Sequence, residues 1–359
     1  MRFLPELEGV RALAALAVVI THVSFQTATG WAWAERLDYG VAVFFVLSGF
    51  LLWRRRHAHT VGQYALSRVA RLAPLYVVCV VAVLALLPDA SPLTLPQLLT
   101  NLTGTQLYIA DGLVPGLTQL WSLCVEFAFY AVLPLLAWAL DRFSARGRVL
   151  LIAGAGVLSL GWGFLPFVAG FESGQVNTQI WPPAYFSWFA VGMLAAEAEA
   201  AQVRLRAGRV VRPVCWAVAA GCVWLASREW FGPQGLVHPA PDEFARRIAA
   251  GAVCGACVVV PVALSPRESW LAAPLMRALG RWSYGVFMWH VAVLAIAFPL
   301  LGVDPFSGAV GDFAVVAAFT VVVSCALSAA TYVLIEAPGR DLIRSLAATR
   351  ADSGGSAGS

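Results

Sequence analysis

Long uncharged apolar segments recur along this chain and constrain its fold more than any other feature. About ten of them approach the roughly 20 residues that a helix needs to cross a bilayer. Their approximate bounds are 9–28, 38–53, 72–88, 119–140, 148–168, 180–198, 211–230, 245–264, 282–302 and 311–335. Charged residues make up only 12% of the 359 residues, about half the share of roughly 25% found in soluble domains. We therefore expect an all-α, polytopic integral membrane protein in the cell membrane.

The arginines orient these segments, because cytoplasmic loops carry an excess of basic residues. If the N-terminus is cytoplasmic, the outward loops hold only Arg36, Arg228, Arg246 and Arg247, and the inward loops hold most of the rest. Both termini are then expected in the cytoplasm. We expect residues 1–345 to form one transmembrane domain and the Gly/Ser-rich stretch 346–359 to be a disordered cytoplasmic tail.

Charge and cysteine usage exclude other classes. The net charge of +4 comes from arginines spread over loops, so no nucleic-acid partner is expected. Seven cysteines, mostly inside apolar runs, argue against a disulfide framework. Cys254 and Cys257 form a CxxC, but Gly251 and Gly255 in the same stretch indicate a helix-packing face rather than a metal or redox site. No metal is expected.

An ionisable side chain inside the first apolar segment is the first candidate functional group. His22 is costly to place in the bilayer, which makes it a functional hypothesis, with a buried structural imidazole as the alternative. Arg11, eleven residues earlier, falls about 20° away on the same helix face and roughly 16 Å along the axis. Counting from Gln119 places Glu126 roughly 10 Å below the outer surface, near the depth of His22. We expect Glu126 to pair with His22 and support it as a general base.

A second layer of polar residues is expected nearer the cytoplasm, with Arg11, Arg68, Arg71, His290 and Glu336. Arg68 and Arg71 are i, i+3 neighbours, and two guanidinium groups on one helix face suit a phosphate-bearing ligand. Alternatives remain for each group. The two arginines also fit anchoring to lipid headgroups, His290 fits a hydrogen bond across helices, and Glu336 fits a structural pair with an inner arginine.

Several motifs follow one another in the order of a known family. They are R-x10-H over 11–22, DYGVAVFFVLSGFLL over 38–52, RxxR over 68–71, WSLCVEFAFY over 121–130, SYGVFMWH over 283–290 and YVLIEAP over 332–338. Together, over about residues 4–340, the chain resembles the membrane acyltransferase 3 family of O-antigen and exopolysaccharide acetylases and actinomycete antibiotic O-acyltransferases. Phe287 and Met288 replace the usual Tyr and Leu of their motif.

The resemblance implies transfer of an acyl group, usually acetyl, from acetyl-CoA or another acyl-CoA to a hydroxyl. The acceptor would be a sugar, a glycolipid or a macrolide-like molecule. His22 and Glu126 are then the catalytic candidates, and Arg11, Arg68, Arg71 and His290 are the candidates that bind the donor. Direct transfer and an acyl-histidine intermediate both remain open. The alternative function is a sugar or lipid transporter or flippase, which buried Arg, His and Glu also suit.

Overall fold

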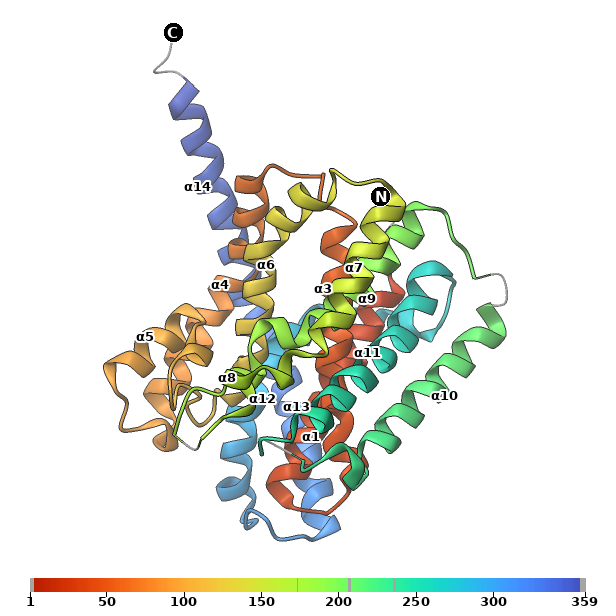
Figure 1. Cartoon of the computed structure of the whole chain (residues 1–359). Helices are drawn as coiled ribbons and strands as arrows, with labels where there is room; N and C mark the ends of the chain where they lie inside the picture. Colours follow the sequence, from red (N-terminus) through yellow and green to blue (C-terminus); the bar gives the residue numbers. More distant parts are fainter. Residues whose placement is uncertain (1–2, 173, 206–207, 235–236, 356–359) are drawn as a thin grey trace.

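The computed structural model describes residues 3–172, 174–205, 208–234 and 237–355, and these form helices and loops without a β-strand (Figure 1). Fourteen α-helices are present within these ranges. They are α1 (Glu6–Thr27), α2 (Ala32–Glu35), α3 (Gly40–Trp53), α4 (Val61–Leu86), α5 (Leu95–Thr103), α6 (Trp121–Leu140), α7 (Ala145–Ser159), α8 (Pro166–Ala169), α9 (Phe186–Ala200), α10 (Gly208–Ala226), α11 (Pro241–Leu264), α12 (Pro274–Leu301), α13 (Val310–Thr331) and α14 (Ala337–Gly355).

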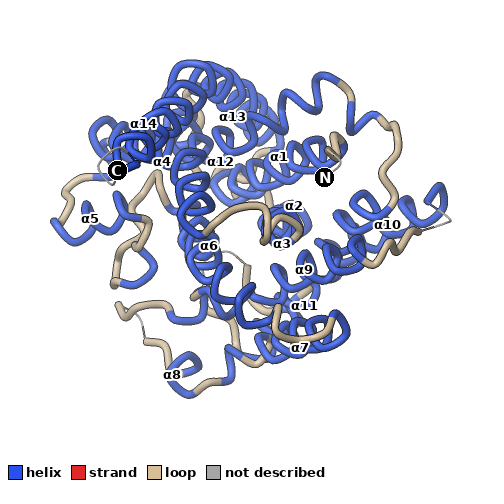
Figure 2. Tube along the Cα trace, turned by 90° about the horizontal axis from the view of Figure 1, so that it is seen from above, coloured by secondary structure: helices blue, strands red, loops and turns tan. Residues whose placement is uncertain are grey.

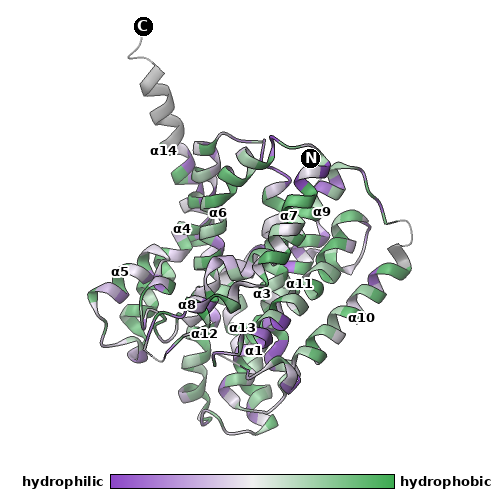
Figure 3. Cartoon of the chain, in the orientation of Figure 1, coloured by the Kyte–Doolittle hydropathy of each residue, from purple (hydrophilic) through white to green (hydrophobic). Residues whose placement is uncertain are grey.

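Seven helical stretches in the described part of the chain are long and apolar enough to cross a membrane. They are Glu6–Thr27, Ala32–Trp53, Val61–Leu86, Thr118–Leu140, Pro241–Leu264, Pro274–Leu301 and Val310–Leu346. Most of the ribbon of these helices is green, the colour of hydrophobic residues, with white and purple turns in between (Figure 3). The protein is therefore a multi-pass protein of the cell membrane. Three other predicted segments, 148–168, 180–198 and 211–230, correspond to the shorter helices α7, α9 and α10.

Two helices begin well before the apolar segments that predict them. The segment 72–88 belongs to α4, which starts at Val61 behind a capping box between Thr60 and Gln63. The segment 282–302 belongs to α12, which starts at Pro274. In both helices the first turns carry arginines, which break the apolar pattern without breaking the helix. Because these two helices start early, their side chains lie deeper than a count from the start of the apolar segment predicts.

Glycines allow several helices to approach closely. A Cβ on Gly49 of α3 would overlap the carbonyl oxygen of Phe189 on α9, and a Cβ on Gly280 of α12 would overlap that of Glu8 on α1. Gly251 and Gly255 of α11 face Trp188 and Val46 in the same way. The predicted packing face on this helix is therefore confirmed, and Cys254 and Cys257 beside it are free thiols.

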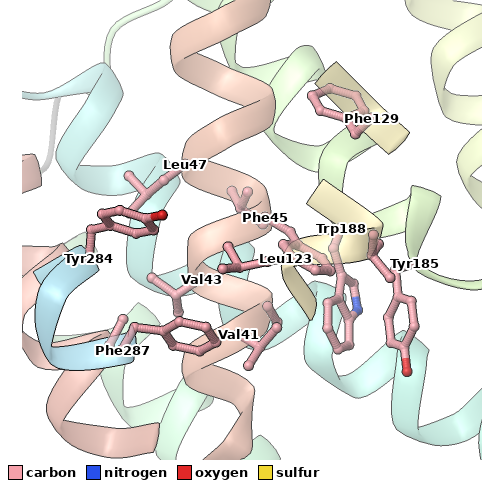
Figure 4. Packing of buried hydrophobic residues seen from close by; sticks show 14 of the residues in the cluster. Val41, Val43, Phe45, Leu47, Leu123, Phe129, Tyr185, Trp188, Tyr284 and Phe287 are labelled. Atoms are coloured by element: carbon pink, nitrogen blue, oxygen red, sulfur yellow. The ribbon is translucent and has the colours of Figure 1, made fainter. Parts of the chain in front are cut away.

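Helix α3 lies near the centre of the bundle, with α1, α6, α9 and α11 around it (Figure 2). Aromatic rings join these helices. Phe189 of α9 stacks on Phe45 of α3 at 4.5 Å and on Phe129 of α6 at 4.0 Å between ring centroids. Trp188 and Tyr185 extend the same cluster, which Figure 4 shows at close range. A packed apolar centre of this kind holds the polar residues of the site at fixed depths.

Helix α1 begins and α14 ends at the same end of the bundle, at the top of Figure 1. We call this the N-terminal end and the opposite one the far end. Helices α1, α4 and α12 run from the N-terminal end to the far end, and α3 and α6 run back. Residues 346–355 of the predicted tail belong to α14, and residues 356–359 lie outside the described part of the chain.

Candidate active site

Three arginines and a glutamate converge on one cavity inside the bundle. The cavity measures about 100 Å³ and lies between α1, α3, α4, α6 and α12. Its polar lining residues are Arg11, Ser48, Arg68, Arg71, Ser122, Glu126, Tyr130, Ser283 and Tyr284. Figure 4 shows Tyr284 and Phe287, which also line it, pointing from α12 towards α3. We call this space the arginine cavity.

Glu126 is held inside the arginine cavity by two hydroxyl groups. The Ser48 side chain of α3 and the Tyr130 side chain of α6 both donate hydrogen bonds to its carboxylate oxygen Oε1. Tyr130 lies one helical turn after Glu126, at i+4, so α6 itself supplies one of the donors. The carboxylate also lies within electrostatic range of Arg11 and Arg68. Its negative charge therefore balances part of the positive charge of the cavity.

Arg68 is fixed between two tyrosines. Its guanidinium lies 6.0 Å from the ring centroids of both Tyr64 and Tyr130, which is within the range of cation–π contacts. The Tyr64 hydroxyl donates a 3.1 Å hydrogen bond to the carbonyl of Tyr130, which ties α4 to α6. Arg71, one turn further along α4, lines the same cavity. The predicted pair of arginines therefore faces a common space together with Arg11.

Glu336 lies at the end of a π-helical turn, Tyr332–Glu336, that links α13 to α14. It is buried, and the cations in its electrostatic range include Arg71 and Arg11. This position near the inner arginines agrees with the placement expected from the sequence. A structural pair between Glu336 and one of these arginines stays a prediction.

A mostly apolar groove leads away from the arginine cavity towards the surface of the bundle. It has a volume of about 390 Å³ and runs between α4, α5 and α6. Arg68, Leu72 and Tyr130 line both spaces, so the groove and the arginine cavity are neighbours across these three side chains. Val69 and Val77 of its wall are about half exposed, on a helix that is apolar enough to face lipid.

His22 and His290 form the second polar group of the site. The Nε2 atom of His290 on α12 lies 3.3 Å from Nδ1 of His22 on α1. The ring centroids are 4.9 Å apart and the rings meet edge to face. His290 is fully buried, whereas His22 keeps part of its surface exposed. The Phe287 ring packs against His290 at 5.7 Å and also lines the arginine cavity, so it separates the two groups.

The predicted pairing of His22 with Glu126 is wrong. The Gln119 side-chain amide donates a 2.8 Å hydrogen bond to the carbonyl of Met288, two residues before His290. The start of α6 therefore lies at the depth of the histidines rather than at the outer surface. Seven residues further, at about 1.5 Å of rise each, Glu126 lies roughly 10 Å nearer the N-terminal end, among the arginines.

The placement of His290 in the arginine layer is also wrong, and the reason is the early start of α12. Because this helix begins at Pro274, His290 lies about twelve angstroms deeper than a start at residue 282 implies. Glu126 and His290 have thus exchanged their expected layers. The groups that sequence reasoning missed are Ser48 and Tyr130, although the i+4 spacing of Tyr130 from Glu126 was a usable signal.

Comparison with known proteins places this site in a family. The model of an acyltransferase domain, Acyl_transf_3, matches residues 4–329. The chain belongs to the acyltransferase 3 family. The match includes Arg11, His22, the two arginines of α4, Glu126 and His290, whereas Glu336 lies just beyond it. In the described part of the chain no group of three or more His, Cys, Asp or Glu side chains could hold a metal ion.

Curated relatives of this acyltransferase 3 protein are O-acetyltransferases and an acyltransferase. The chain is 25% identical over 334 residues to the peptidoglycan O-acetyltransferase OatA of Listeria monocytogenes, covering 84% of this chain and 51% of that protein. It is 26% identical over 339 residues to the acyltransferase MdmB of Streptomyces mycarofaciens, covering 83% of this chain and 81% of that protein. The chain thus spans about half the length of the Listeria relative. No solved structure matches.

Proposed function

We propose that this protein is a membrane O-acyltransferase that moves an acyl group, most simply acetyl, from acyl-CoA to a hydroxyl group of an acceptor. The family and the names of the relatives support acyl transfer. The observation that carries the proposal is the arginine cavity, which lies beside a histidine pair within the membrane-spanning helices. Cations inside a membrane domain are costly unless a ligand or a partner uses them.

Arg11, Arg68 and Arg71 are proposed to hold the phosphate groups of the donor. Guanidinium groups bind phosphate oxygens by paired, charge-assisted hydrogen bonds, and the carboxylate of Glu126 leaves the cavity with a net positive charge. We assign Glu126 to this donor-binding cavity, in place of a direct partnership with His22. With Ser48 and Tyr130 it positions the arginines and limits their mutual repulsion.

His22 is proposed as the general base. In direct transfer, the acceptor O–H bond breaks and the proton moves to His22. The alkoxide oxygen then forms the new C–O bond, the thioester C–S bond breaks, and the CoA thiolate takes the proton back from the imidazolium. In the alternative, a ring nitrogen of His22 attacks the thioester, the C–S bond breaks and the CoA thiolate leaves. The acceptor oxygen then takes the acyl group from the imidazole as the C–N bond breaks, and the acceptor proton passes to the thiolate. Rapid-quench labelling with radioactive acetyl-CoA in the absence of acceptor separates the two routes, since only the second labels the protein.

The acceptor is proposed to be a hydroxyl-bearing sugar, a glycolipid or a macrolide-like molecule. The relative from Listeria is named for peptidoglycan, which agrees with a carbohydrate acceptor. The groove between α4 and α6 has a mostly apolar lining on a helix that is apolar enough to face lipid, which suits the apolar part of a membrane-borne acceptor. Membrane lipids are the other expected partners of this surface.

The proposed topology has about ten membrane spans and both termini in the cytoplasm, with residues 1–345 as one acyltransferase domain. The seven long apolar helices are supplemented by α7, α9 and α10, of which α7 packs against α9 and α10 packs against α11 at the edge of the bundle in Figure 1. Arg54, Arg56 and Arg148 lie at the N-terminal end, where they pair with Glu199, Asp141 and Glu197. A basic end agrees with a cytoplasmic location, from which acyl-CoA would enter.

The test is acyl transfer by the purified full chain in detergent, with labelled acetyl-CoA and a panel of sugar, glycolipid and macrolide acceptors. His22→Ala should lower the rate by at least about 10²-fold, because it removes the general base. His59→Ala is the matched control, since this exposed histidine lies outside the site, and it should keep the wild-type rate. Full activity in His22→Ala would overturn the assignment. Sugar or lipid flux in liposomes without acyl transfer would favour the transporter alternative.

A further inference from the structure

The proton positions on His22 and His290 follow from their backbone partners. The carbonyl oxygens of Phe287 and Val286 lie 2.8 and 3.2 Å from Nδ1 of His290. A carbonyl oxygen only accepts hydrogen bonds, so this Nδ1 carries the proton. In the neutral ring, Nε2 of His290 is then left with a lone pair and can only accept a hydrogen bond.

His22 also carries its proton on Nδ1. The carbonyl oxygen of Val18, one turn earlier on α1, lies 2.9 Å from Nδ1 of His22, so this nitrogen also carries a proton. The lone pair of His290 Nε2 lies 3.3 Å from the same atom. The His22 N–H is therefore shared between Val18 and His290, and both contacts require one and the same tautomer.

We infer that His290 is the positioning residue of the acyl-transfer base, because it accepts the Nδ1–H of His22 and leaves Nε2 of His22 as the free, basic nitrogen. This inference rests on the proposed function, and it removes His290 from the set of donor-binding groups. A base needs a third group that holds it in the right tautomer and orientation, a place that carboxylates often occupy. Here a neutral imidazole, itself locked by two carbonyls of α12, occupies it.

The arrangement also has a consequence for the reaction. When His22 takes the acceptor proton on Nε2, the ring becomes an imidazolium and its Nδ1–H becomes a stronger donor. The hydrogen bond to His290 then strengthens in the transition state, where the stabilisation raises the rate rather than substrate affinity. A negatively charged partner would gain more from the same change, but its burial between α1 and α12 would cost more than that of a neutral ring.

The ring tautomers test the inference without any assay of activity. The full chain in detergent, labelled with ¹⁵N-histidine, gives the protonation of each ring nitrogen, with His22→Ala and His290→Gln used for assignment. Both rings should show a protonated Nδ1 and an unprotonated Nε2, and the exposed His59 serves as the reference. An unprotonated Nδ1 on either His22 or His290 would overturn the inference.

Two variants test the functional part. His290→Gln keeps an acceptor oxygen towards His22 and a donor towards Phe287, whereas His290→Leu keeps neither. His290→Leu should lower kcat by about 10- to 10²-fold with little change in the KM for acetyl-CoA, as expected for a hydrogen bond to a developing charge. His290→Gln should recover most of kcat. Equal losses in both variants, or a rise in KM instead of a fall in kcat, would contradict a positioning role.

The two experiments separate failure of this inference from failure of the proposed function. If the wild-type chain transfers no acyl group to any acceptor while both rings show the expected tautomer, the acyltransferase proposal fails and the proton arrangement stands. If transfer depends on His22 but the tautomers differ, the proposed function stands and the role of His290 is overturned. If His290→Leu does not fold, the wild-type spectrum and the kcat of His290→Gln still test the positioning role of His290.

Discussion

Glu6 and Arg212 form a buried ion pair at the N-terminal end of the bundle, although 206 residues separate them in the sequence. The two guanidinium nitrogens donate hydrogen bonds of 2.6 and 2.9 Å to the two carboxylate oxygens. The Glu6 and Arg212 side chains are 1% and 4% exposed. The Ser269 hydroxyl and the backbone N–H of Arg267 donate further hydrogen bonds to the Glu6 carboxylate. This pair ties the start of α1 to α10 and to the connection between α11 and α12.

Removing one partner of this pair should be more harmful than removing both. We expect Glu6→Leu or Arg212→Met alone to lower the free energy of unfolding by about 3–5 kcal/mol, because each leaves an uncompensated buried charge. The double variant should lose less than either single variant, because no buried charge is left without a partner. Thermal unfolding of the three variants in one detergent measures the coupling. Additive losses would show that the two side chains do not stabilise each other.

The contact between α3 and α9 should not tolerate a single added methyl group. A Cβ on Gly192 would overlap the backbone of Val46 and Phe50. We expect Gly192→Ala to lower the free energy of unfolding by about 1–3 kcal/mol or more, as overpacking against backbone does. Gly154→Ala on α7 is the matched control, since nothing lies within 4 Å of the added atom and helix propensity favours alanine by about 1 kcal/mol. A comparable drop in Tm for both would contradict the close approach.

The arginine cavity should determine the affinity for the acyl donor. We expect Arg68→Leu to raise the KM for acetyl-CoA by about 10- to 10²-fold, the effect of losing a hydrogen bond to a charged group. Arg68→Lys should recover only part of this loss, because a point charge does not reproduce a paired guanidinium contact. Arg142→Leu is the control, as its guanidinium stacks on Trp138 away from the cavity. An unchanged KM in Arg68→Leu would place the donor phosphates elsewhere.

The loop before α11 should lose stability in acid. His238 stacks on Phe171 at 4.7 Å between ring centroids, and partial burial lowers the pKa of its imidazole. A histidine whose pKa is lower in the folded chain stabilises the fold above its unfolded pKa of about 6.5, and this contribution is lost as the pH falls below that value. The protection factors of the Val237, His238 and Ala240 amides, which correct for the intrinsic pH dependence of exchange, should therefore fall between about pH 6.5 and 5. His238→Phe should remove that change, and an unchanged pH dependence in this variant would show that another group titrates.

The sequence alone identified the candidate site residues of this protein and the lipid bilayer as its surroundings. Apolar segments near the length of a bilayer predict a polytopic helical protein, because a backbone in lipid must satisfy its own hydrogen bonds. The motifs predict the family and select Arg11, His22, Glu126, the two arginines of α4 and His290 before any coordinate is known. These are local properties of the chain, readable from composition and spacing.

Only the tertiary structure decided which of these groups meet. The depth of a side chain depends on where its helix begins, and α12 begins eight residues before its apolar segment while α6 begins inside the bundle. Each residue by which a helix start shifts moves its side chains by about 1.5 Å along the axis. A shift of several residues therefore moves a side chain from the arginine layer to the histidine layer, or the reverse. For that reason His22 meets His290 rather than Glu126. The contact is set by the packing of α1 against α12, which neither helix specifies by itself.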